Sequence, residues 1–209
     1  MQEEKNINHL KLIEAHKNNI IISDKRMSDK YTYFEDSKLD ESKTLLYEIE
    51  KKPVHFNRYF RGEIVRVKFG VNIGSEFSGD HFAIVISKKD TMMNPTLHVI
   101  PITSKKHQKS LDIGSILYNE VEIKKLKKLK TKYANDNSKI KKINKVINYY
   151  SKRKQVKSFA CIDHIKTISK LSISKTLFKE FDYLPNIKCN KKVLNKINNE
   201  IIKEYITFN

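Results

Sequence analysis

Glycine, proline, cysteine and tryptophan are scarce in this 209-residue chain, which has five glycines, four prolines, two cysteines and no tryptophan. Cys161 and Cys189 are too few to suggest a disulfide framework, and no cysteine or histidine pair shows zinc-site spacing. We therefore expect two free, mostly buried thiols, no structural metal and no cofactor.

Long apolar runs are also missing. No window approaches the roughly 18 consecutive apolar residues of a membrane span, and the charged start MQEEKNINH lacks the apolar core of a secretory signal. These absences predict a cytoplasmic protein with no membrane partner. With 39% hydrophobic residues, we expect one globular domain with extensions.

Acidic residues are in short supply after Pro53. The chain carries a formal charge of +18, yet residues 1–55 hold ten basic and eleven acidic side chains, so the remainder carries +19. Such asymmetry predicts a polyanionic partner, nucleic acid above all, because lysine and arginine neutralise phosphates with release of counterions. The alternative is compositional: an AT-rich genome also favours Asn, Ile and Lys, which would then only solvate the surface.

The few glycines are concentrated. Four of the five lie within residues 61–87, RGEIVRVKFGVNIGSEFSGDHFAIVIS, and Gly114 follows. Glycine is favoured where the backbone needs a positive φ or a close approach. This region of tight turns is expected to hold the active or binding surface.

Helical periodicity characterises the N-terminal part. Apolar residues recur at helical spacing over residues 6–19 and again over residues 40–52, with Asp40 as an N-cap. The polar stretch 23–38, which includes Tyr31, Tyr33 and Phe34, is expected to be a linker or a loosely packed turn. We therefore predict a helical N-terminal extension over residues 1–55.

Strand-like runs follow over residues 64–69, 82–86, 97–102, 111–117 and 159–168, the fourth interrupted by Gly114. Short β-branched runs with polar connections predict an α+β fold with a mainly β core, a small curved sheet or barrel, over residues 56–209. The tail from Ser174 is expected to be helical and split by Pro185, with a final helix over residues 193–205 packed on the sheet.

A lysine-rich insertion interrupts the strands at about residues 119–155. Two amphipathic patterns, 121–133 and 139–150, predict a helical hairpin that breaks near residues 135–138. Residues 105–157 hold 17 basic and 4 acidic side chains, a net charge of +13. The hairpin is either a pair of surface helices whose lysines face water or a clamp for a phosphate backbone.

Several motifs occur in a telling order: RG before a strand, the loop GSEFSGDHF, the strand AIVIS, then VIPITS and finally FACIDHIKTISK. This order resembles the MazF/PemK family of toxin endoribonucleases from toxin–antitoxin systems. The resemblance covers residues 61–104 and 158–170. It implies an SH3-like small β-barrel with a terminal helix.

The resemblance further implies metal-independent cleavage of single-stranded RNA, in which the substrate's 2′-hydroxyl attacks the adjacent phosphate. It also implies a homodimer restrained by an antitoxin protein. The reaction needs a base, an acid and donors for the charge that builds on the phosphate.

Candidate catalytic residues come from two of the motifs. The family's loop arginine falls on His81, and histidine titrates near neutrality and can exchange a proton. Thr103 and Ser104 match a Thr-Ser pair whose threonine lies at the family's catalytic centre, although both hydroxyls also suit the capping of a turn. His164, beside Asp163, is a second acid or base candidate.

Candidate RNA-binding residues surround these. Glu76 and Asp80 flank the loop and are placed to orient His81, while Gly74 and Gly79 permit its turns and a close approach to the nucleotide. Phe77 either stacks on a base or packs against the sheet. The remaining candidates are lysines expected to bind phosphates: Lys88, Lys105, Lys106 and Lys166.

Two other functions remain open. The first is a non-enzymatic toxin similar to the gyrase-poisoning CcdB proteins, a group that depends on a tryptophan near its C-terminus. The second is a catalytically degenerate protein that binds RNA or DNA through the basic insertion. For residues 1–55, the sequence leaves open whether they cover the basic face, help dimerisation, replace part of an antitoxin contact or simply pack.

Overall fold

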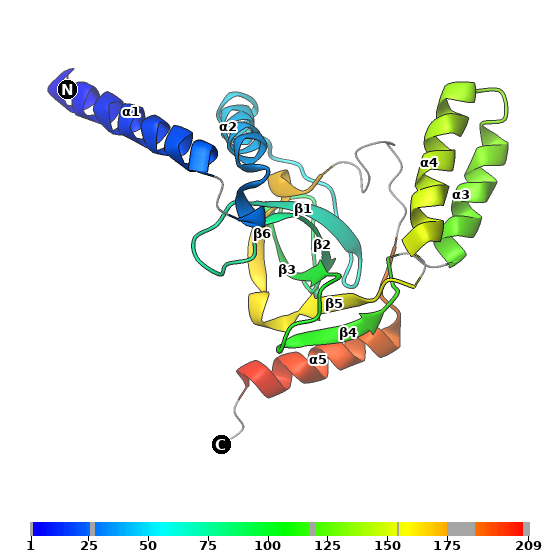
Figure 1. Cartoon of the computed structure of the whole chain (residues 1–209). Coiled ribbons are helices and arrows are strands. Elements are labelled where there is room, and N and C mark those ends of the chain that lie inside the picture. The colour runs from blue at the N-terminus through cyan, green and yellow to red at the C-terminus, as the bar shows by residue number, and fades with distance from the viewer. Residues whose placement is uncertain (1, 26–27, 118–119, 154, 175–186, 207–209) are drawn as a thin grey trace. The chain divides into compact units, whose positions relative to one another are not determined.

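The computed structural model describes residues 2–25, 28–117, 120–153, 155–174 and 187–206, with the side chains of residues 2–6 and 120–122 excepted (Figure 1). The chain forms two compact units: residues 1–51 with 69–79, and residues 52–68 with 80–209. The expected interruption at Pro185 lies outside the described residues.

The first unit is helical. It contains α1 (Gln2–Lys25), a 3₁₀ turn η1 (Asp29–Tyr31) and α2 (Phe34–Lys51). Both helices begin before their periodic patterns, and α1 also continues beyond its pattern. No glycine or proline lies in these stretches to end a helix. The apolar residues that suggested the helices are largely exposed, among them Ile7, Leu10, Leu46 and Ile49.

Two expectations for this unit are wrong. Asp40 lies inside α2 and does not cap it, since the helix already begins at Phe34 with Glu35 and Asp36 in its first turn. Acidic side chains there complement the positive end of the helix dipole. Of the two alternatives for residues 23–38, the linker is excluded: η1 and the first turn of α2 occupy much of this stretch, and Phe34 is buried.

The second unit contains a six-stranded sheet, with β6 beside β3 and the other strands in the order β1-β2-β3-β5-β4. The strands are β1 (Ile64–Gly70), β2 (Gly79–Val85), β3 (Thr96–Thr103), β4 (Ser110–Gly114), β5 (Ser158–Cys161) and β6 (Lys166–Ser169). Pairing is antiparallel between β3 and each of β2, β5 and β6, and between β4 and β5. The α+β expectation is thus confirmed.

The expected strand 159–168 is in fact two strands. β5 pairs with the end of β3, Ile102 opposite Ala160, whereas β6 pairs with its beginning, Leu97 opposite Ile168. These two registers differ by three residues. The 3₁₀ turn η2 (Ile162–His164) accommodates the difference. The expected strand 111–117 is also shorter, because β4 ends at Gly114, whose φ is +72°.

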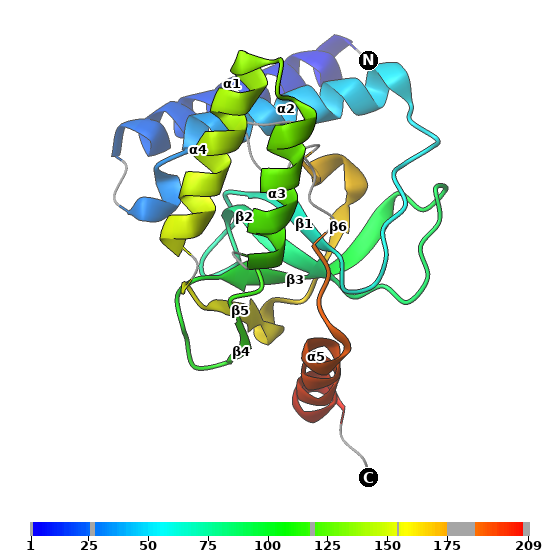
Figure 2. The ribbon, with the colours of Figure 1, turned by 90° about the vertical axis from the view of Figure 1, so that its right-hand side faces the viewer.

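The α-helices described in this unit are α3 (Glu120–Lys132), α4 (Asn137–Arg153) and α5 (Lys191–Tyr205). α3 and α4 lie side by side as a hairpin (Figure 2). Asp136 accepts a hydrogen bond from the amide of Lys139 (3.0 Å) and so caps α4 at the expected break. Asn190 caps α5 in the same way through the amide of Val193 (2.9 Å).

One apolar cluster joins the sheet to these helices. It includes Ile84 and Ile100 of the sheet, Leu126 of α3, Tyr150 of α4 and Ile197 of α5, all almost fully buried. Their burial supplies most of the driving force that holds the helices in place. The hairpin is therefore anchored in the core even though its outer face is charged.

The Arg61-Gly62 pair secures α5. The guanidinium of Arg61 donates to the carbonyl of Ile86 and to the side chain of Asn198 on α5. Gly62 has φ +84°, and a Cβ there would lie 3.0 Å from Cδ1 of Leu194 on the same helix. Glycine is needed here both for the backbone conformation and for the close approach of the helix.

No helix in the described ranges is long and apolar enough to cross a membrane.

Candidate functional site at one end of the sheet

His81 and Thr103 come from neighbouring strands. β2 and β3 pair with Ala83 opposite Pro101 and Val85 opposite Val99. The same register, continued by two residues within both strands, aligns His81 with Thr103. Residues directly opposite in an antiparallel pair point to the same face. The two candidate catalytic residues are therefore expected neighbours on one face, at the end of the sheet where β2 begins and β3 stops.

The surroundings of Thr103 are partly open. Its side chain is half-buried, and its Oγ1 accepts a hydrogen bond from the amide of Lys105 (3.1 Å). The hydroxyl thus does cap a turn. It keeps its own proton for donation to a phosphate oxygen. Ser104, Lys105 and Lys106 follow and are exposed.

An ion pair lies next to His81 in the sequence. Nε of Arg66 on β1 is 2.7 Å from Oδ1 of Asp80, with both side chains about three-quarters buried. Asp80, which the sequence suggested as a partner for His81, is therefore engaged by an arginine. Sequence analysis missed Arg66, although a charged residue between Val65 and Val67 in a strand run was a signal for it.

The loop that precedes His81 belongs to the N-terminal unit from Phe69 to Gly79. The side-chain amide of Asn72 donates to the carbonyls of Phe69 (3.0 Å) and Phe77 (2.7 Å). The backbone N–H of Asn72 donates to Ser78 Oγ (3.0 Å). Asn72 is a second residue that sequence analysis missed, since asparagine is common in any turn.

Other contacts hold the same loop. Lys30 donates to the carbonyl of Gly74 (2.9 Å), and Phe77 packs edge-on against Phe69 with ring centroids 5.3 Å apart. Gly74 and Gly79 have φ of +57° and +96°, as their predicted turns require. Phe77 is half-buried while Glu76 is exposed. The sequence left open whether Phe77 stacks on a base or packs against the sheet, and the structure shows it packed against Phe69 of β1.

Lys88 lies at the other end of the sheet. It follows β2, which runs away from His81 for about 13 Å from that residue to Val85 at the usual strand rise. The structure brings Lys105 and Lys106, but not Lys88, to the end that carries His81 and Thr103.

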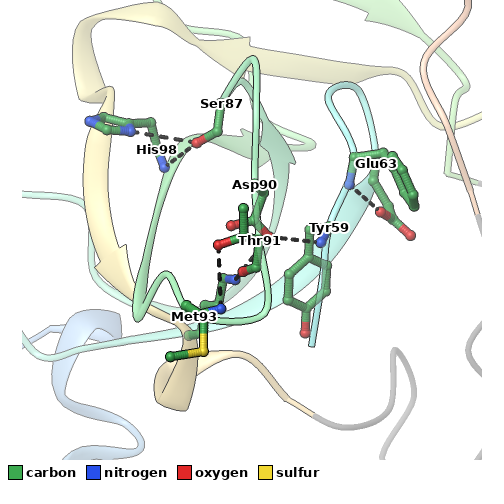
Figure 3. A network of polar contacts seen from close by, with 9 residues as sticks. Tyr59, Glu63, Ser87, Asp90, Thr91, Met93 and His98 are labelled. Atoms are coloured by element: carbon green, nitrogen blue, oxygen red, sulfur yellow. Dashed lines mark hydrogen bonds and ion pairs between the residues drawn. The ribbon is translucent and has the colours of Figure 1, made fainter. Parts of the chain in front are cut away.

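A polar network occupies that opposite end (Figure 3). Nζ of Lys170 lies 2.8 Å from Oδ2 of Asp90, with the side chains only 2% and 1% exposed. The amide of Tyr59 donates to the same oxygen (2.9 Å). Burial opposes ionisation of Asp90, but these hydrogen bonds and the charge of Lys170 outweigh it and lower the pKa of the carboxyl. Nothing in the sequence marked this buried pair, because its members are 80 residues apart.

The late candidates are also dispersed. Lys166 pairs with Val99, four residues along β3 from Thr103 and on the same face by register. His164 lies in η2, beyond the end of β5 remote from Thr103, with its Nε2 3.8 Å from Asp163. Of these two, only Lys166 shares the sheet face of the proposed catalytic residues.

The cysteines are free and buried, as expected. Burial raises the pKa of both thiols, Cys161 and Cys189, to about 12, so neither is a nucleophile near neutral pH. Among the described residues, no group of histidine, cysteine and carboxylate side chains is arranged to hold a metal ion.

The chain is similar to known proteins. Residues 60–203 match the model of the family described as PemK-like, MazF-like toxin of type II toxin-antitoxin system. A solved structure, MazF (Form-I) from Deinococcus radiodurans, is similar with 12% sequence identity and a TM-score of 0.40, over 70% of this chain and 96% of that one. Curated proteins contain no match. Because the family model spans well over half of the sequence, the chain belongs to the PemK-like, MazF-like toxin family of type II toxin–antitoxin systems.

Proposed function

We propose that this toxin is an endoribonuclease that cleaves single-stranded RNA in the cytoplasm without a metal ion. The observation that supports the proposal is the register of β2 and β3, with Ala83 opposite Pro101, in a toxin of this family. Continued by two residues, this register would bring His81 opposite Thr103 at one end of the sheet. An SH3-like barrel is the inferred frame, supported by the bridge that joins Val67 of β1 to Ile173. A homodimer and an antitoxin partner complete the proposal.

The chemistry requires two proton transfers. The 2′-hydroxyl of the substrate attacks the adjacent phosphorus and loses its proton to a base, while the bond from phosphorus to the 5′-oxygen breaks and that oxygen gains a proton. The products are a 2′,3′-cyclic phosphate and a 5′-hydroxyl. His81 is the proposed proton-transfer group, because imidazole both accepts and donates protons near neutral pH.

The charge that builds on the phosphate needs donors. The Thr103 hydroxyl is assigned this role, since the extended register of β2 and β3 is expected to bring it to the same face as His81. Ser104, Lys105 and Lys106 lie just beyond it and are assigned to the flanking phosphates, with Lys166 further along the same face. Glu76, Phe77 and Gly79 remain proposed RNA contacts of the loop.

The test is cleavage of end-labelled single-stranded RNA by the full chain in the presence of a chelator. His81→Ala is expected to lower the rate by about 10²–10⁴, the usual contribution of a general acid or base. His98→Ala is the matched control, because this exposed histidine lies at the opposite end of the sheet beside Ser87. Its rate is expected to equal that of the unmodified chain.

Equal cleavage by His81→Ala and the unmodified chain would refute the role of His81. Products that carry a 5′-phosphate would exclude attack by the 2′-hydroxyl. If the unmodified chain binds RNA and leaves it intact, the endoribonuclease proposal fails in favour of a degenerate nucleic-acid-binding protein.

A further inference from the structure

We propose that the solvent face of the α3–α4 hairpin binds the phosphate backbone of single-stranded RNA and extends the substrate path away from the His81 end of the sheet. The inference rests on the proposed function in taking single-stranded RNA as the ligand. It assigns to the hairpin affinity for the chain, and no part in the cleavage step.

The first support is charge. Residues 123–153 contain one acidic residue, Asp136, and its carboxylate is engaged by Lys139 at 3.1 Å. Exposed lysines cover the rest of the helices: Lys124, Lys127, Lys128, Lys130, Lys132, Lys141, Lys142, Lys145 and Lys152. A field of one sign on one element attracts a polyanion and releases its counterions on contact.

The second support is the absence of an apolar centre on this face. Four apolar side chains of the hairpin are at most 2% exposed: Leu126, Ile143, Val146 and Tyr150. The apolar side of the hairpin therefore packs against the core. Among the described residues 123–153, Tyr149 is the one large apolar side chain that is exposed. The guanidinium carbon of Arg153 lies 3.8 Å from the centroid of the Tyr149 ring. Protein interfaces have a desolvated apolar centre and are depleted in lysine, whereas nucleic-acid interfaces are polar and basic. The face therefore suits RNA better than an acidic protein.

The third support is spacing. Lys124, Lys128 and Lys132 of α3 recur at every fourth residue, as do Lys141 and Lys145 of α4. At the rise of an α-helix, successive ammonium groups in such a row are about 6 Å apart along the axis. A regular row of point charges fits a repeating phosphate backbone and reads no bases.

The fourth support is position. The hairpin connects the end of β4 to the start of β5, where Gly114 is opposite Ser158. The next residue of β5, Phe159, pairs with Thr103. The hairpin thus springs from the same end of the sheet as His81 and Thr103. At the helical rise, the 17 residues of α4 extend about 25 Å, enough to add several nucleotides to the path.

Binding of fluorescent, unstructured RNA tests the inference directly. The hairpin variant carries Lys124→Gln, Lys128→Gln, Lys141→Gln and Lys145→Gln. The control carries Lys191→Gln, Lys192→Gln, Lys196→Gln and Lys203→Gln, four exposed lysines of α5 with the same loss of charge. Both are made in the His81→Ala background, so that no cleavage accompanies binding. Glutamine has good helix propensity, and circular dichroism checks that each variant folds.

The hairpin variant is expected to bind a long RNA about tenfold more weakly than the control at moderate salt. The slope of log affinity against log salt should fall by up to about 3, since each neutralised phosphate of a single strand contributes roughly 0.7. A short RNA that covers only the cleavage site should bind both variants equally. In the cleaving background, KM for long RNA should rise while kcat stays unchanged.

Equal affinity and salt slope for the two variants would overturn the inference. Loss of poly-glutamate binding with RNA binding intact would also overturn it and assign the face to an acidic protein. Because binding is measured without cleavage, an inactive enzyme that still shows the hairpin effect refutes the proposed function and leaves this inference standing.

Discussion

At the scale of single residues, glycine is required in this chain for two different reasons, a positive φ and the close approach of a helix. Gly62 and Gly114 both have positive φ, at +84° and +72°, but a Cβ on Gly62 would crowd Leu194 whereas one on Gly114 would meet nothing within 4 Å. The pair therefore separates backbone strain from helix packing.

Gly114→Ala is expected to destabilise the fold by about 1 kcal/mol or somewhat more, from backbone strain alone. Gly62→Ala should cost roughly 1 kcal/mol beyond that, because Leu194 must move from its place against the core. Chemical denaturation of both variants measures the difference. Equal losses would show that α5 yields freely to the added methyl group.

The residues of the candidate site were only partly predictable. His81 and Thr103 could be chosen because they match residues of the family's motifs. His81 was expected in a loop but lies within β2, where the register against β3 is expected to bring it opposite Thr103. Arg66 was marked only as a charged residue within a strand run, and its partner Asp80 was not predictable. Asn72 carried no signal, because its role depends on the loop carbonyls that it binds. The periodicity of a sequence predicts which face of a strand or helix carries a residue. It does not predict which polar group the residue contacts.

At the scale of elements, the β2–β3 connection is held by a buried ion pair. Lys170, which follows β6, contacts Asp90 and also donates to the carbonyl of Thr91 (2.9 Å). Oδ1 of Asp90 is buried and has no hydrogen-bond partner among the described residues. The pair ties two distant segments together at the cost of removing both charges from water.

Asp90→Asn is expected to destabilise the protein by about 3–5 kcal/mol, because it strands the ammonium group of Lys170 in the interior. The double variant Asp90→Asn, Lys170→Met should recover most of that loss. Thermal unfolding of the single and double variants provides the measurement. A double variant as unstable as the single one would mean that the ion pair itself, and not the stranded charge, supplies the stability.

The same pair predicts a pH dependence. The folded pKa of Asp90 lies below its ordinary 3.8, so its contribution is fully present above about pH 4 and is lost as the pH falls through the lowered value. Comparison of stability between pH 5 and pH 2 should therefore show a smaller acid loss in the Asp90→Asn variant. Parallel curves for the two proteins would contradict this expectation.

Most elements of the second unit could be predicted from periodicity to within a few residues, since their apolar repeats reflect local burial. In α1 and α2 the same repeat indicated helices whose apolar residues are largely exposed. The split between β5 and β6 could not, because it follows from two registers against the same strand, β3. The early start of α2 at Phe34 was missed for a different reason: its first turn is polar and carries no apolar repeat.

At the scale of the whole molecule, none of the side chains described between residues 7 and 51 belongs to the main apolar cluster, whose buried members lie between Ile64 and Ile197. A chain that begins at Lys52 is therefore expected to keep the sheet, the hairpin and α5. The N-terminal extension over residues 1–55 stays a prediction, which this truncation would test.

Thiol labelling tests that truncation. Cys161 and Cys189 are 0% and 7% exposed, with pKa values raised to about 12. In a folded truncated chain both should react as slowly as in the full chain, and rapidly only in denaturant. Rapid labelling of the truncated chain in native buffer would show that the sheet needs the first 51 residues.

The N-terminal unit is discontinuous, and this affects the order of events during synthesis. α1 and α2 leave the ribosome first, but their unit also contains residues 69–79. The unit is incomplete until Gly79 emerges, and by then β1 has appeared without β2 or β3. Because domains generally fold as units during synthesis, we expect the two helices to remain without their completed unit until Gly79 has left the ribosome.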